Sequence, residues 1–541
     1  MEPIDWVLVV LLNLLVIAYG TWRSRRTTSS HDWLVASRSL PFWIVGLSMF
    51  ATSVDGGDYI SNSGAVYQHG LAMVAVWWLS PVGAVIAGWF VLPPMYRAGM
   101  VTNAEYLEAR FGVTARVLSV FVQIQYRGVI LAIVARALHL ALTDIAHVES
   151  GLAWWVVGCF ALATMIYVSL GGLKTVAVTD VLLSAIMIIS AVVLWTIVSR
   201  EVGGWSGAEA RITAQEGAER ARQMLHIGAP RPQFLHPVVL VLGHLCVATG
   251  YAVVNHSQTM KMFGARSLWD VKMSAVIVGA SSALIIFFIG SLGIFGRALE
   301  PGLESSDSIF PYLVDRYVTT GFKGLVLAGV VAAAISSFEG IGSALAALFT
   351  CDVYARVLVR NASDRHYLRV SRIASIAIVG LSFLFIPGIL NEATMIDFFF
   401  DLTSAFVTPL LTIYLMGVFT RVHRKAGVIG LLAGFTYGVV RLLAISEDLD
   451  LFTLPFWFTE RFVAYLWSLG VTASAMIGAS MVFGWESTRE VVRPENQDEG
   501  RAVIESPFAA EGRAMPLWAR PGLWAVLVVL GSLVAVFGVF W

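Results

Sequence analysis

The sequence has little charge and almost no cysteine for its length. Of its 541 residues, 13% are charged, roughly half the share found in soluble domains. Hydrophobic residues make up 57%, which argues against a water-soluble enzyme. Lys plus Arg and Asp plus Glu both number 36, so no basic surface for nucleic acid is indicated. The three cysteines, Cys159, Cys246 and Cys351, are too scattered for a disulfide framework or a zinc site.

Motifs of energy coupling and export are also missing. No GxxxxGK[ST] phosphate loop occurs, so the chain lacks the nucleotide-binding motif that ATP-driven transport would require. The start, MEPIDW, carries acids and no Lys or Arg, unlike a secretory signal, so we expect the first apolar segment to remain as a membrane anchor. The longest polar stretches, 200–235 and about 485–520, are too short for a second domain.

Long apolar runs dominate the rest of the chain. We count about fourteen that could cross ~30 Å of hydrocarbon as helices. They do not alternate every second residue as the strands of a membrane barrel do. The sequence therefore predicts an all-α polytopic membrane protein, with segments at 4–22, 41–69, 71–95, 117–143, 152–170, 180–199, 236–260, 273–295, 322–357, 370–394, 396–419, 426–445, 461–484 and 522–540.

The distribution of positive charge predicts the orientation. Lys and Arg gather in the loops that follow odd-numbered segments, including the loop with Lys261, Arg266 and Lys272. These loops are expected to be cytoplasmic. Stretch 200–235 is then external, and both termini face outward from the plasma (inner) membrane.

The second segment turns abruptly polar about a third of the way along, within SVDGGDY. Adjacent Gly56 and Gly57 unwind a helix cheaply, and unwound backbone at membrane depth survives only beside protein or a wet cavity. Such breaks commonly hold substrate and coupling ion in secondary transporters. The alternative is a glycine-rich kink with its aspartates near the external interface.

The ninth segment carries Ala333, Ser336 and Ser337 at i, i+3 and i+4, which places them on one helix face. Sodium prefers oxygen ligands, and hydroxyls with freed carbonyls supply them without a charge that is costly in the bilayer. Taken alone, the serine pair is equally typical of helix packing.

Together the segments resemble the sodium:solute symporter family. The motifs that carry the resemblance, in the family's order, are ATSVDGGDYISNSGAVYQHG at 51–70, YRAGMVTNAEYLEARFG at 96–112, YVSLGGLKTVAVTDVLL at 167–183, KGLVLAGVVAAAISSFEGIGSALAALFTCDVY at 323–354 and PLLTIYLMGVFTRVHRKAGVIGLLAGF at 409–435.

The resemblance implies the leucine-transporter fold, a 5+5 inverted repeat whose halves each begin with a broken helix. Segment seven must then break too, and we expect this near Gly250 in ATGYAVVNHSQ; the family's usual Gln-Arg after it is Met260-Lys261 here. The implied division is an extra helix and loop at 1–40, a first repeat at 41–199, the external loop 200–235, a second repeat at 236–420 and additional helices at 421–541.

The resemblance also implies a sodium site. Its candidate ligands are the carbonyls of Ala51, Val54 and Ala333 and the hydroxyls of Ser336 and Ser337. Asp180 matches a family acid near the cytoplasmic exit path, although its place at the start of segment six is equally compatible with a helix cap.

The solute cavity is expected beside the broken helices. Asp55 is the informative residue there, because a buried carboxylate is normally paired or functional. It favours a solute with an ammonium group or a second cation, or else it pairs with Arg127. Glu339 is a possible cation way-station or a helix-packing residue, and His244 and His256 are predicted to be packed. The candidate solute contacts are Ser53, Asp55, Asp58, Tyr67, Gln68, Tyr251 and Asn255.

The predicted function is sodium-coupled symport of a small polar solute, such as an amine, amino acid, carboxylate or sugar, without covalent chemistry. The partners expected are the solute and the lipid bilayer, with no obligate protein partner. A proton-translocating, antiporter-like subunit is the main rival, but it needs lysines inside helices and the sequence places none there. A transporter-like sensor lacks a signalling domain, and an intramembrane enzyme lacks a cluster of catalytic residues.

Overall fold

The computed structural model describes residues 1–24, 36–390, 394–446, 454–486, 504–510 and 514–541. Within these ranges the chain is helical, and its only β-pairing is an isolated bridge between Leu40 and Ala265. Twelve helical stretches in the described ranges are long and apolar enough to cross a membrane, and two shorter apolar helices accompany them. The all-α membrane class is confirmed, whereas the count of fourteen crossings is not.

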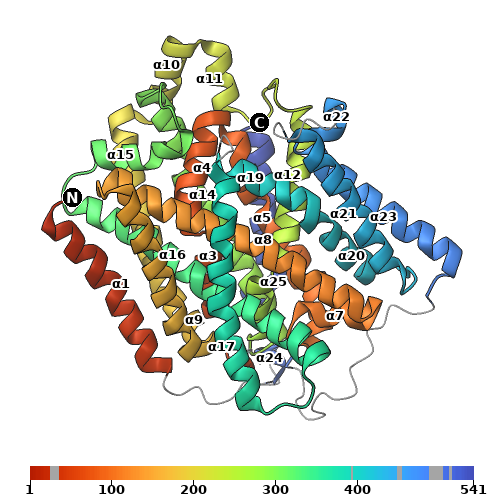
Figure 1. Cartoon of the computed structure of the whole chain (residues 1–541). Helices are drawn as coiled ribbons and strands as arrows, with labels where there is room; N and C mark the ends of the chain where they lie inside the picture. Colours follow the sequence, from red (N-terminus) through yellow and green to blue (C-terminus); the bar gives the residue numbers. More distant parts are fainter. Residues whose placement is uncertain (25–35, 391–393, 447–453, 487–503, 511–513) are drawn as a thin grey trace.

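The helices follow one another as a bundle (Figure 1). The first half of the chain contains α1 (Pro3–Ser24), α3 (Phe42–Ser53), α4 (Gly56–His69), α5 (Ala75–Ile86), α6 (Leu92–Arg97), α7 (Asn103–Phe111), α8 (Val113–Leu140), α9 (Ser150–Val202), α10 (Gly204–Glu216), α11 (Ala218–Leu225), α12 (Pro237–Val254) and α13 (His256–Phe263). The second half contains α14 (Leu268–Leu299), α15 (Ile309–Tyr317), α16 (Phe322–Leu348), α17 (Asp364–Ser382), α18 (Ile386–Leu390), α19 (Met395–Leu402), α20 (Thr408–Phe419), α21 (Ala426–Ile445), α22 (Phe456–Thr459), α23 (Val463–Phe483), α24 (Pro507–Ala510) and α25 (Pro521–Val534).

The centre of the bundle is built around α3, α9, α14 and α16. Helix α16 packs along α9, and α3 contacts both α9 and α14. On the outside, α1 contacts α9 and α16. It exposes Leu11, Leu14 and Leu15, while its buried Asn13 donates to the Ala328 carbonyl of α16 at 3.3 Å. Apolar residues outside and polar groups inside is the arrangement that a lipid solvent favours.

Stretch 200–235, expected as an external loop, is largely helical. It forms α10 and α11, which Figure 1 shows together at one end of the bundle. Gly217 between them has φ +92°, a left-handed value that favours glycine. An ion pair between Arg297 and Glu216, 2.6 Å from Nε to Oε1, ties the end of α10 to α14. Residues 204–225 therefore form a helical hairpin that packs against α14. Many of their polar residues are good helix formers.

Close packing of α5 on α12 depends on a glycine. A Cβ atom at Gly83 would lie 2.4 Å from the carbonyl oxygen of Ala248 and 2.8 Å from the amide nitrogen of Thr249. Both contacts are with backbone, which cannot rotate away as a side chain can. Small residues at such crossings let membrane helices approach closely.

We therefore expect Gly83→Ala to force α5 and α12 apart and to cost about 1–3 kcal/mol of folding free energy, as overpacking typically does. The measurement is the melting temperature of the purified protein in detergent. Gly470→Ala on α23 is the matched control, since no atom lies within 4 Å of a Cβ there. Equal melting temperatures for the two variants would contradict this account of the crossing.

Candidate functional site

The break expected in the second apolar segment is present between α3 and α4. Val54 is extended, with φ −103° and ψ 94°. Asp55 and Asp58 then form a capping box that starts α4: Asp58 N donates to Asp55 Oδ1 at 3.0 Å, and Asp55 N donates to Asp58 Oδ2 at 2.8 Å. Because the Asp55 amide is used in this way, the carbonyl of Ala51 loses its i+4 helical partner. A freed carbonyl beside a helix break is a ready cation ligand.

The second break separates α12 from α13, but it does not lie at Gly250 as expected. Gly250 stays inside α12, and the chain leaves the helix at Asn255, with φ −68° and ψ 107°. The Asn255 side chain caps α13 by accepting from the amide and the hydroxyl of Ser257. Capping chemistry therefore sets the position of this break, because Asn satisfies the orphan amides of a new helix.

Helices α3 and α16, which carry sodium-site candidates, are in contact beside the first break, although the side chain that α3 contributes to this contact is Thr52, next to the candidate Ala51. Thr52 Oγ1 is 3.3 Å from Ser336 Oγ. The Ser336 hydroxyl donates to Asp180 Oδ1 at 2.6 Å, and the Ser337 hydroxyl donates to the Ala333 carbonyl at 2.9 Å. Since each hydroxyl proton is held by another acceptor, the lone pairs of both oxygens remain available to a cation.

Asp180 is a central acceptor of this region and not a helix cap. It is fully buried and lies in the second part of α9, which runs without interruption from a kink at Gly172, where φ is +71°, to Val202. Its carboxylate accepts from the hydroxyls of Ser48 and Ser336 and from the ammonium of Lys261. One side chain thus joins α3, α9, α13 and α16.

Lys261, expected from the sequence in a cytoplasmic loop, lies instead in the interior of the protein. It lies in α13 and is 1% exposed. Its Nζ donates to the Ser48 carbonyl at 2.7 Å, to Asp180 Oδ2 at 2.9 Å and to the Thr52 hydroxyl. A buried ammonium needs such an oxygen cage and a counter-ion. The expectation that no lysine lies within a buried helix is therefore wrong.

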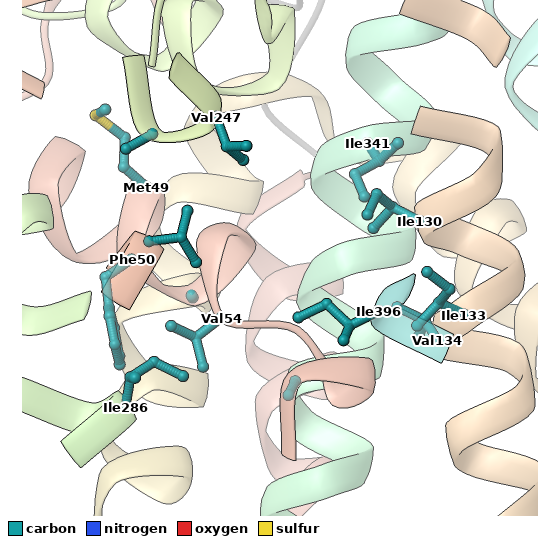
Figure 2. Packing of buried hydrophobic residues seen from close by; sticks show 14 of the residues in the cluster. Met49, Phe50, Val54, Ile130, Ile133, Val134, Val247, Ile286, Ile341 and Ile396 are labelled. Carbon is teal, nitrogen blue, oxygen red and sulfur yellow. The ribbon is translucent and has the colours of Figure 1, made fainter. Parts of the chain in front are cut away.

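A cavity lies between the two broken helices and α5, α8 and α19. Four of the seven candidate solute contacts line it, namely Ser53, Asp55, Asp58 and Tyr251. Figure 2 shows buried apolar residues of this region, with Met49, Phe50 and Val54 on one side and Ile130 and Ile133 of α8 on the other; of these, Met49, Ile130 and Ile133 line the cavity. The lining residues that the sequence analysis missed include Trp77, Ile130, Ile133, Gln258, Met262, Phe399 and Phe400.

The other three candidates do not line this cavity. Asn255 caps α13, as described above. The Tyr67 hydroxyl donates to the Glu300 carbonyl at 2.8 Å, and Gln68 Oε1 accepts from the Ser306 hydroxyl at 2.8 Å. These two residues hold the far end of α4 against the segment that follows α14. The position of Glu339 is also clear: it is 1% exposed and accepts from the Thr179 hydroxyl at 3.2 Å.

Helix α19 is oriented by ion pairs on its face away from the cavity. Asp401 accepts from Arg441 at 2.7 Å and from Arg461 at 2.9 Å, and Asp397 also pairs with Arg461. The neighbouring residues Phe399 and Phe400 line the cavity. This network therefore holds Phe399 and Phe400 in place as an aromatic part of the cavity wall. Nothing in the local sequence indicated that α19 would contribute these residues.

Comparison with known proteins gives the class of this chain. The model of the sodium:solute symporter family matches residues 33–434. The chain belongs to this family. A relative named sodium/glucose cotransporter 4 from Danio rerio is 27% identical over 481 residues, which cover 82% of this chain and 72% of the relative. The sodium/glucose cotransporter of Vibrio parahaemolyticus is 25% identical, with 84% and 88% covered.

Solved structures agree on the fold of this symporter. An outward-open, substrate-bound Na⁺-coupled sialic acid symporter superposes with a TM-score of 0.75 at 19% identity, covering 90% of this chain and 99% of that one. The leucine-transporter fold expected from the sequence is confirmed. The symporter is a multi-pass membrane transporter and not an enzyme, and sodium is its coupling ion.

Proposed function

We propose that the chain carries one small polar organic solute inward together with sodium, by alternating access to the cavity between its two broken helices. The observation that carries this proposal is the side-by-side placement of that cavity and the oxygen cluster formed by Ser336 and Thr52. Both adjoin the break after α3, so ion and solute would bind to the same interrupted helix. Such breaks are the usual meeting point of substrate and ion in secondary transporters.

The proposed sodium ligands are the carbonyls of Ala51, Val54 and Ala333 with the hydroxyls of Ser336 and Ser337. A cation bound there would tie α3 to α16 and thereby favour the conformation in which the cavity accepts solute. The coupling is reciprocal, because each ligand stabilises the state that the other prefers. Inward movement of one sodium ion supplies about 2.3 kcal/mol per 100 mV of membrane potential, in addition to its concentration gradient.

Uptake into proteoliposomes tests this function. Purified protein would be reconstituted and offered labelled amines, amino acids, carboxylates and sugars, each with and without an inward sodium gradient. We expect at least one solute to accumulate only when the gradient is present, and not when potassium replaces sodium. Binding without uptake would point to a sensor, and accumulation driven by a proton gradient alone would contradict sodium coupling.

The orientation and the domain division of the chain are part of the same proposal. Both termini, α10 and α11 face outward from the plasma membrane, and residues 355–370 face the cytoplasm. The first repeat spans 41–199 and the second 236–420. The charge distribution of the loops supports this orientation, and Figure 1 is compatible with it, since the C-terminus lies at the end of the bundle that carries α10 and α11.

Cysteine labelling in intact cells checks this orientation. In a variant whose three native cysteines are alanine, we expect Ser206→Cys on exposed α10 to react with a membrane-impermeant maleimide added outside. Arg360→Cys, exposed beyond α16, should react only after the cells are permeabilised. The reverse pattern would overturn the topology.

A further inference from the structure

The middle of α8 carries a buried guanidinium that has no hydrogen-bond partner. Arg127 is 1% exposed, and its Nε, Nη1 and Nη2 atoms donate to no acceptor in the described part of the chain. Its guanidinium lies over the rings of Tyr126 and Tyr251, 5.5 Å and 5.3 Å from their centroids. Ring faces attract a cation but cannot replace five hydrogen-bond acceptors.

Other buried arginines of the described ranges are satisfied within the protein. Arg116 and Arg441 form ion pairs with Asp352 and Asp401. Arg110 and Arg231 donate to backbone carbonyls. Arg127 therefore differs from its counterparts, and a buried charge without a partner is costly enough in a membrane protein to indicate a functional group.

Arg127 adjoins the cavity of the proposed transport site. Ile130, three residues further along α8 and so on a neighbouring part of the same helix face, lines the cavity. Tyr251, whose ring the guanidinium covers, also lines the cavity. The guanidinium of Arg127 thus lies against Tyr251, a residue of the cavity wall.

Asp55 is one of two carboxylates that line the cavity, and it forms no ion pair with Arg127. No ion pair within 4 Å links Arg127 to any acid among the described residues, so the pairing considered from the sequence is absent. Asp55 lines the cavity and uses Oδ1 to cap α4. Asp55 therefore faces the cavity and Arg127 lies behind its Tyr251 wall, without a direct ion pair between the two opposite charges.

We propose that Asp55 and Arg127 receive the two ends of a zwitterionic solute of the α-amino acid class, the ammonium at Asp55 and the carboxylate at Arg127. The inference rests on the proposed function and names its substrate class. A neutral sugar or a simple amine has no carboxylate, so either solute would leave the guanidinium of Arg127 without an anionic partner. A planar guanidinium with paired donors matches a carboxylate bidentately. The aromatic wall of Trp77, Phe399 and Phe400 would contact the apolar part of the solute.

The test measures sodium-driven uptake of each of the twenty L-α-amino acids and of glucose. For each amino acid transported, its decarboxylated amine and its deaminated acid are then used as competitors. We expect one or more amino acids to be transported, and both singly charged analogues to bind at least tenfold more weakly. Sodium-driven uptake of glucose with no amino acid uptake would overturn the inference and leave the proposed function standing. Absence of sodium-driven uptake for every solute offered would instead count against the proposed function.

Charge-removing variants assign each end of the solute. Arg127→Gln should weaken binding of the amino acid at least tenfold and leave the affinity of the amine analogue unchanged. Asp55→Asn should also weaken binding of the amino acid at least tenfold, but leave the affinity of the acid analogue unchanged. Arg136→Gln, elsewhere on α8, is the matched control and should leave all affinities unchanged. If Arg127→Gln does not fold, Arg127→Lys keeps the charge but loses the bidentate geometry, and the same comparison applies. Equal losses for all analogues would overturn the assignment.

Discussion

Replacing Ser336 and Ser337 together by alanine should weaken sodium binding at least tenfold. The change deletes two hydroxyl oxygens and little volume, and each lost polar contact is expected to cost about 1–3 kcal/mol. Both side chains are fully buried, so bulk solvent does not reach them in this conformation. The measurement is the sodium concentration that gives half-maximal uptake of a transported solute.

Ser343→Ala on the same helix is the matched control for this double variant. Its hydroxyl donates to the carbonyl of Glu339 in its own helix, so its loss should not alter the sodium dependence. If the double variant kept the half-saturating sodium concentration of the unmodified protein, the five proposed ligands would not be the coupling site.

Breaking the buried pair of Lys261 and Asp180 should have the largest effect on stability. Lys261→Met leaves a carboxylate in the membrane interior without its counter-ion, and Asp180→Asn leaves an ammonium. Removal of one partner of a buried pair typically costs about 3–5 kcal/mol. We expect both single variants to melt at much lower temperature in detergent, or to be recovered in low yield.

The double variant Lys261→Met with Asp180→Asn distinguishes a true pair from two independent losses. It contains no uncompensated charge, so its stability should lie closer to that of the unmodified protein than either single variant does. Additive destabilisation in the double variant would show that the two side chains contribute separately.

Much of the broken-helix arrangement could be predicted from the sequence. Adjacent glycines flanked by aspartates inside an apolar run predict the first break. The structure places it at Val54, just before them, whereas Gly56 and Gly57 lie in the first turn of α4, which the capping box of Asp55 and Asp58 starts. The spacing of Ser336 and Ser337 predicts a shared face, which follows from the period of the helix. These features are local, and local chemistry is what a sequence displays.

The residues that were misplaced depend on lengths and tertiary partners. Tyr67 lies twelve residues after Asp55, about 18 Å along a helix, so it reaches the loop beyond α14 and not the cavity. Lys261 was assigned to a loop because it directly follows the apolar segment 236–260 and precedes Arg266 and Lys272. Asp180 supplies its counter-ion from α9, 81 residues away in the chain. Only the fold brings these two charges together.

The charge balance around Lys261 has an electrical consequence. Lys261 and Asp180 cancel each other, and the five proposed sodium ligands are carbonyls and hydroxyls with no net charge. A sodium ion would therefore keep its full positive charge when bound there. Each sodium carried inward with a zwitterion would move one net charge, so the transporter would generate a measurable current. At 100 mV, the corresponding ~2.3 kcal/mol would support a solute gradient of roughly 50-fold from the voltage alone.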